Sequence, residues 1–215
     1  MALDPCPPQQ HIEIRQVSLE RSSSSDLPGY GASLATTALG PPVLPQWCVW
    51  LEPPRAEEPD RWEQRWHTAV TAALETWSQH VPIRFVPSPD RAQVLIRRQR
   101  PPRRQISGSW RASNGRSQLQ VVDVKRRDQW RLEPRVDVMV SPELRAPVLQ
   151  ATALHELGHA FGLWGHSPEP TDAMAVHQRQ SPVLTLSTRD RSTFSWVMQQ
   201  QTRFGMPSEP ARSMR

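Results

Sequence analysis

Residues 155–166 read His-Glu-Leu-Gly-His-Ala-Phe-Gly-Leu-Trp-Gly-His, and this segment carries the clearest chemical pattern in the chain. His155 and His159 are four residues apart, so on a helix both imidazoles project from one face and can bind a single ion. Zn²⁺ suits them, because it accepts neutral imidazole nitrogens and, in catalytic sites, keeps one of its four positions for water. Glu156 is the candidate general base for that water. The segment therefore predicts a catalytic zinc site on a helix.

The third ligand follows the helix. Gly162 can adopt the left-handed conformation that ends a helix and turns the chain back, which makes His166 the candidate. In the extended motif H-E-x-x-H-x-x-G-x-x-H the last histidine would fall at Gly165, so we interpret Gly165 as a one-residue insertion. A bare H-E-x-x-H can arise by chance on a solvated helix, but the added Gly162 and His166 make chance the weaker explanation.

Length and charge bound the remaining possibilities. A chain of 215 residues is long enough for one domain with a sizeable core and extra length at its ends. It has 26 Lys+Arg against 21 Asp+Glu, for a formal charge of +5, and Lys125 is its only lysine. This moderate basicity suits acidic substrates or surfaces but does not by itself imply nucleic acid.

The cysteines, the apolar runs and the first residues of the chain bear on cross-linking and compartment. Only Cys6 and Cys48 occur, so we expect no disulfide framework to hold the fold together. No apolar run approaches the ~18 residues that a membrane span requires, and the first residues lack the basic and apolar regions of a signal peptide. We expect a soluble, monomeric chain without a visible export signal.

Three regions are expected. Residues 1–44, rich in Pro and Ser, are expected to be mostly disordered, with a packed-on arm as the alternative. Residues 45–205 should form the domain, and residues 206–215 a tail. A Cys6 thiolate could occupy the open position of the zinc and keep the site latent, but an incidental cysteine is the favoured interpretation. Cys48 is interpreted as a buried apolar residue.

The predicted fold class is α+β: a mixed, twisted sheet of about five strands with three helices, and the zinc cleft at the second helix. Alternation and β-branched content predict strands over 46–51, 83–86, 93–97, 119–124 and 136–140. Apolar spacing and capping residues predict helices over 60–80, 146–161 and 187–201. His67 and His80, in or beside the first helix, are expected to be surface or helix-end residues, not metal ligands.

A basic run forms a separate feature, made of Arg97, Arg98, Arg100, Arg103 and Arg104. A solvated loop is the favoured interpretation, and a rim for an acidic substrate or a phosphate-rich partner is the alternative. No aromatic residue interrupts the run, so a platform for single-stranded nucleic acid is poorly supported.

The chain resembles the matrix metalloproteinases, or matrixins, of the metzincin clan of zinc peptidases. The residues that carry the resemblance are His155, Glu156, His159, Gly162, His166, Ser167 and Met174. Met174 falls eight residues after His166, as in that family, which favours His166 over Asp172 as the third ligand. The order of elements over residues 45–205 is also similar.

The resemblance implies an extracellular or extracytoplasmic metalloendopeptidase that hydrolyses proteins or peptides. One Zn²⁺ would be held by the three histidines over a hydrophobic floor made by Met174, with Glu156 as general base and an extended peptide on an edge strand. Ala175 and Val176 replace the family's usual aromatic residue and proline, so pocket specificity stays open. The family's second zinc lacks its histidines here, its cysteine-switch motif is missing, and structural calcium stays open.

Two other classes remain as alternatives. One is a module that holds zinc and binds peptides or a partner without turnover, which leaves no use for Glu156. The other is an arginine-based binder of acidic ligands or nucleic acid, which leaves the histidines unexplained. On the zinc hypothesis, His166→Ala should abolish zinc binding, whereas deletion of Gly165 should be tolerated.

Overall fold

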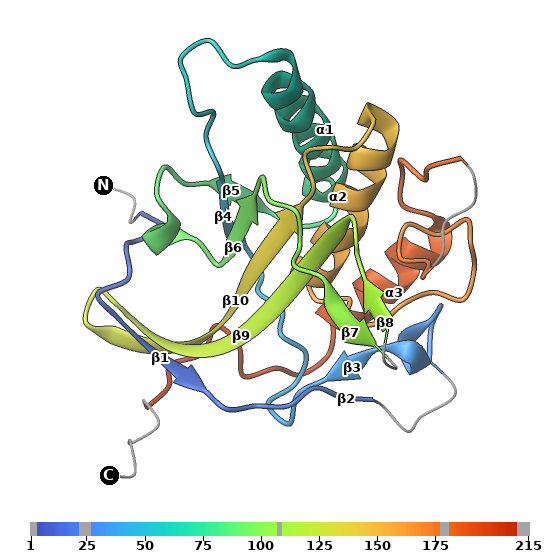
Figure 1. Cartoon of the computed structure of the whole chain (residues 1–215). Coiled ribbons are helices and arrows are strands. Elements are labelled where there is room, and N and C mark those ends of the chain that lie inside the picture. Colours follow the sequence, from blue (N-terminus) through green and yellow to red (C-terminus); the bar gives the residue numbers. More distant parts are fainter. Residues whose placement is uncertain (1–3, 22–26, 107–108, 177–180, 210–215) are drawn as a thin grey trace.

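The principal sheet has six strands in the order β1-β9-β10-β6-β4-β5 (Figure 1). The computed structural model of the chain describes residues 4–21, 27–106, 109–176 and 181–209. The strands are β1 (His11–Arg15), β4 (Trp47–Leu51), β5 (Ile83–Phe85), β6 (Val94–Arg97), β9 (Gly115–Arg126) and β10 (Gln129–Val140). The β10–β6, β6–β4 and β4–β5 pairs are parallel, whereas β9 is antiparallel to both β10 and β1. The mixed α+β sheet is confirmed, with one strand more than predicted.

Three α-helices occur in the described part of the chain, as predicted: α1 (Arg61–Ser78), α2 (Ala146–Ala160) and α3 (Thr188–Met198). The α1 and α2 helices lie side by side against one face of the sheet (Figure 1). Asp60 caps α1, because its carboxylate accepts the backbone N–H groups of Trp62 and Glu63, both at 2.8 Å. No helix among the described residues is long and apolar enough to span a bilayer.

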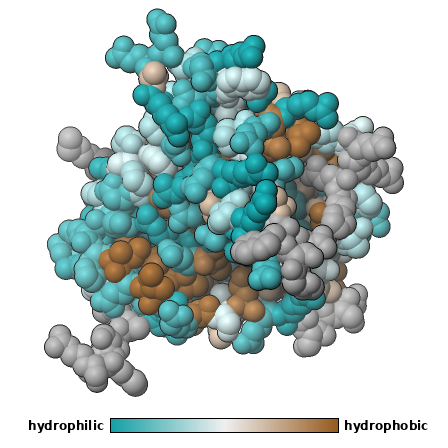
Figure 2. All heavy atoms as spheres, viewed as in Figure 1, coloured by the Kyte–Doolittle hydropathy of each residue, from teal (hydrophilic) through white to brown (hydrophobic). Residues whose placement is uncertain are grey.

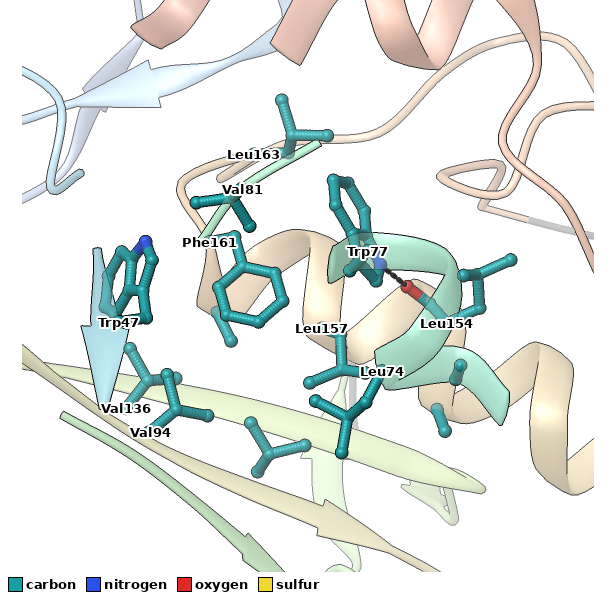
Figure 3. Close-up of a cluster of buried hydrophobic side chains, with 14 of the residues drawn as sticks. Trp47, Leu74, Trp77, Val81, Val94, Val136, Leu154, Leu157, Phe161 and Leu163 are labelled. Atoms are coloured by element: carbon teal, nitrogen blue, oxygen red, sulfur yellow. Dashed lines mark hydrogen bonds between the residues drawn. The ribbon is translucent and has the colours of Figure 1, made fainter. Parts of the chain in front are cut away.

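The core joins α1 to α2 through fully buried aromatic rings (Figure 3). The ring of Phe161 meets Trp47 and Trp77 edge to face, at centroid distances of 5.7 and 5.6 Å. The indole N–H of Trp77 donates to the carbonyl oxygen of Leu154 at 2.9 Å. Because Leu154 directly precedes His155, these contacts fix the part of α2 that carries the metal-binding pattern.

The N-terminal segment differs from the mostly disordered one that was expected. Strand β1 pairs with β9 over five residues, and β2 (Glu20–Arg21) pairs with β3 (Ala35–Thr36) beside a short 3₁₀ helix, Gly31–Ser33. Tyr30 and Leu34 are buried in the main core. A band of hydrophobic side chains covers β1 and the segment that follows it (Figure 2), including Ile14 and Leu19. The described part of residues 1–44 is thus a packed arm, and its partners lie far along the chain.

Cys6 and Cys48 form a disulfide. The expectation that no disulfide holds the fold and the interpretation of Cys6 as incidental are therefore wrong. The Cys6 thiol is not available as a latch on zinc, and Cys48 is more than a buried apolar residue. Arginines from elsewhere in the fold hold the same end of the arm: Arg91 donates to the Cys6 carbonyl at 3.2 Å, and Arg126 donates to the Pro7 carbonyl. A pairing across 42 residues leaves no mark in local sequence.

The β9 and β10 strands are longer than predicted, with twelve residues each, and together form one hairpin. Its turn uses Arg127 and Asp128 at positive φ, 48° and 63°, within the charged stretch that separated the two predicted strands. Part of the connection over 105–117 forms a second hairpin, β7 (Arg104–Ile106) with β8 (Ser109–Arg111). The described start of the predicted tail packs on β10, where the Ser208 N–H donates to the Trp130 carbonyl.

The basic run is largely neutralised within the fold. Arg97 pairs with Asp137 at 2.9 Å, Arg100 with Glu143 at 3.0 Å, and the nearly buried Arg98 with Glu63. Arg103 and Arg104 are exposed and have no ion pair among the described residues, so the predicted solvated loop holds for that part of the run but not for Arg97 and Arg98.

Candidate metal centre

Three histidines from two elements converge beside the sheet. His155 and His159 project from the same face of α2, and His166 approaches from the loop that follows. Their ring centroids are 4.9 Å apart for His155–His159, 5.2 Å for His155–His166 and 4.9 Å for His159–His166. One ring nitrogen of each lies within 4.8 Å of the others, in the only such group of potential ligands among the described residues. The predicted triad is brought together, and it can hold one metal ion.

Backbone carbonyls fix the tautomer of the two helical histidines. Nδ1 of His155 lies 2.9 Å from the Ala173 oxygen, and Nδ1 of His159 lies 2.7 Å from the Leu163 oxygen. A carbonyl oxygen only accepts hydrogen bonds, so each Nδ1 carries the proton and each Nε2 keeps its lone pair. This is the arrangement in which histidine binds transition metals, and the three-nitrogen donor set fits Zn²⁺.

The surroundings keep these imidazoles neutral. Burial lowers the pKa of His155 to about 4 and that of His159 to about 3, and in each case neighbouring histidines lower it further. The pKa of His166 is also lowered, first by burial and then by the charge of Arg21. Because only the neutral ring binds a cation, the site needs no deprotonation step near pH 7.

The turn after α2 depends on Gly162, as predicted. Its φ is 121°, and a Cβ at this position would collide with the side chain of Val43. The Leu163 N–H then donates to the Gly158 carbonyl at 2.9 Å, which reverses the chain toward the histidine pair.

Gly165 has a packing role that was not expected from the sequence. It forms a β-bridge with Leu34, and the N–H of Ala35 donates to the Trp164 carbonyl at 2.7 Å. A Cβ on Gly165 would collide with the backbone oxygen of Ser33. The interpreted insertion is therefore the contact through which the N-terminal arm holds the loop that carries His166.

Glu156 lies between α2 and β9. Its carboxylate accepts a hydrogen bond from the Ser117 hydroxyl at 2.8 Å, and Gly115 leaves it space, since a Cβ there would press on the Glu156 side chain. Burial raises the pKa of Glu156 to about 7, against the opposing effect of the Ser117 hydrogen bond. Sequence reasoning missed Ser117 and Gly115, and their only signal was the predicted position of a strand near by.

Asp172 has other partners, which separates it from the metal-binding group. Its carboxylate accepts a hydrogen bond from the Ser167 hydroxyl at 2.5 Å and pairs with Nε of Arg189 at 3.3 Å.

Met174 is fully buried, with its sulfur against Gly158, in the turn of α2 between the two helical histidines. Met174 therefore packs against α2 at a position between the two helical histidines in the sequence.

A cavity of about 640 Å³ opens beside these groups. Its walls include His159, His166 and Ser117, together with residues of the N-terminal arm. Comparison with known protein families and with curated proteins found no match for this chain.

Proposed function

We propose that the chain is a zinc-dependent metalloendopeptidase with a metzincin-like, matrixin-type fold. The observation that carries the proposal is the convergence of three neutral imidazoles, His155, His159 and His166, with the buried Glu156 directly after the first of them on α2. The packing of Met174 against α2, the glycine turn and the order of elements also support the resemblance. The activity, the substrate and an extracellular or extracytoplasmic location are part of this proposal.

When bound, Zn²⁺ would supply Lewis acidity to a scissile carbonyl and lower the pKa of a coordinated water. Residues of the chain would hold the ion and transfer the proton. Nε2 of His155, Nε2 of His159 and one ring nitrogen of His166 would hold the ion, and the backbone carbonyls behind the first two rings keep those rings oriented. Glu156 takes a proton at its carboxylate and passes it to the leaving amine, while the Ser117 hydroxyl holds that carboxylate in place.

Substrate would bind along β9. Strand β1 pairs with β9 only from Val121 to Lys125, so Gly115–Gln120 have no strand partner on that side among the described residues. An extended peptide can add to such an edge through main-chain hydrogen bonds. Ser117 lies within this stretch and lines the cavity with His159 and His166, which would bring the peptide past the metal site.

The test is digestion of a peptide library by purified zinc-loaded protein. We expect internal cleavage that a zinc chelator abolishes and that Glu156→Gln, which keeps the shape but not the base, reduces by orders of magnitude. Zinc content is measured in parallel, so that loss of turnover is separated from loss of metal. Full activity of Glu156→Gln would refute the mechanism, and stoichiometric zinc without turnover on any library would favour the non-catalytic peptide-binding module.

A further inference from the structure

The cavity beside the histidines is lined by residues from distant parts of the chain. Ser117 of β9 is one of them. The N-terminal arm contributes Leu19, Arg21, Ala32, Ser33 and Ala35. A peptide that lay along the free stretch of β9 and entered this cavity would therefore also meet the arm.

The part of the cavity that the arm lines is built into the fold. Arg21 is paired with Ala35 in the β2–β3 ribbon. The same Ala35 donates its N–H to the Trp164 carbonyl, on the loop that carries His166. The backbone of Arg21 is thus joined, through the one strand β3, to the metal-binding loop, residues 162–166.

Arg21 is the only arginine among the described residues that line the cavity. Many arginines pair with carboxylates of the fold, such as Arg15 with Asp123 and Arg126 with Glu133, but Arg21 has no ion pair among the described residues. None of the described residues that line the cavity is acidic. Arg21 and His166 line the same cavity, so the guanidinium lies in the space next to the histidine site. An unpaired guanidinium in a cavity free of carboxylates is suited to an acidic group on a ligand.

We propose that Arg21 is a specificity-determining residue that binds an acidic side chain of the peptide in this cavity. The inference rests on the peptidase function proposed above, and it names the substrate class as peptides with Asp or Glu close to the scissile bond. The recognition is provided by the N-terminal arm, not by the pocket-lining residues that follow Met174 in related enzymes.

The experiment uses two matched series of fluorescent octapeptides, one with a single Glu and one with a single Gln. Within each series that residue is moved through every position. Binding is measured by fluorescence anisotropy on zinc-loaded full-length Glu156→Gln, and cleavage on the wild-type protein. We expect one or two adjacent positions at which Glu is preferred over Gln by about fivefold, the upper range for a solvent-exposed ion pair, with a preference that falls as salt rises. Arg21→Gln should remove this preference, and Arg21→Glu should reverse it, so that Gln is preferred over Glu at the same positions.

Arg84→Glu is the matched control, because Arg84 is exposed on β5, at the sheet edge opposite β1, and the substitution changes net charge equally. The Arg84→Glu variant should keep the same preference for Glu peptides as the wild-type protein. Equal binding of Glu and Gln peptides at every position, or an acidic preference that survives Arg21→Glu, would overturn the inference. Cleavage without an acidic preference would refute the role of Arg21 but not the peptidase function. Selective binding of Glu peptides without cleavage would refute the peptidase function but not the role of Arg21. The absence of both binding and cleavage would refute both proposals.

Discussion

Cys6→Ala is expected to lower the free energy of unfolding by about 4 kcal/mol. The disulfide joins residues separated by 42 positions. In the chain-entropy account, a cross-link that closes a loop of this length removes about 13 cal/mol/K from the unfolded chain, or about 4 kcal/mol at 25 °C. Alanine retains the backbone contacts of Cys6 with Asp4 and Arg91, so the change mainly removes the covalent link. For a domain of this size, the thermal midpoint should fall by about 8–16 °C.

The assay is equilibrium urea unfolding followed by the fluorescence of the nine tryptophans. Oxidised wild type, reduced wild type and Cys6→Ala are compared, and the last two should coincide at a lower midpoint. Zinc affinity should be unchanged, because Leu34 and Ala35 hold the metal-binding loop through their own backbone contacts. An unchanged midpoint in Cys6→Ala, or two titratable thiols in the native protein, would refute the reasoning.

Three further predictions concern the metal site. His166→Ala should abolish zinc binding while Asp172→Ala retains it, because the Asp172 carboxylate is already engaged by a serine and an arginine; metal content after dialysis measures both. Gly165→Ala should weaken zinc affinity by about tenfold or more, by displacing the loop that it packs, and a chelator competition assay would show no change if the contact does not matter. Ser117→Ala should lower kcat by up to about tenfold with little change in KM, because it removes one hydrogen bond that orients Glu156; an altered KM with unchanged kcat would contradict this.

The sequence was informative about the metal site because its signal is local. Two histidines at helical spacing must share a face of α2, and a glycine with φ of 121° must follow it for the third histidine to return. The choice of His166 over Asp172 came from the distance to Met174; in the structure His166 lies in the histidine group, and Asp172 is tied to Ser167 and Arg189. Caps could be predicted for the same reason, as at Asp60, where donor and acceptor lie within one turn.

The features that sequence reasoning missed are pairings between distant positions. Strand β1 shows in the sequence only as a short alternation around residues 11–19, which did not suffice to predict a strand, because its stability comes from β9, more than 100 residues later. The disulfide, the ion pairs of the basic run and the Ser117–Glu156 hydrogen bond have the same character. Each depends on which surfaces the folded chain brings together, and no local pattern of residue types encodes that.

The metal-binding loop is held from the N-terminal side at three points. Val43 fills the space over Gly162, Leu34 bridges Gly165, and the Tyr30 hydroxyl donates to Asp190 at 2.9 Å. The other oxygen of that Asp190 carboxylate accepts the Ala173 N–H at 2.9 Å, in the turn that supports His155.

A chain cut to residues 45–205, the domain boundary predicted from sequence, would lose all three contacts while keeping every metal ligand. We therefore expect this fragment to bind zinc far more weakly than the full chain, even if residues 1–44 are supplied as a separate peptide at equimolar concentration, because the covalent connection raises their effective concentration. The measurement is zinc affinity by competition, with circular dichroism to report folding. A fragment that folds and binds zinc as tightly as the full chain would show that residues 1–44 are an appendage and that α2, with its glycine turn, is sufficient to position His166.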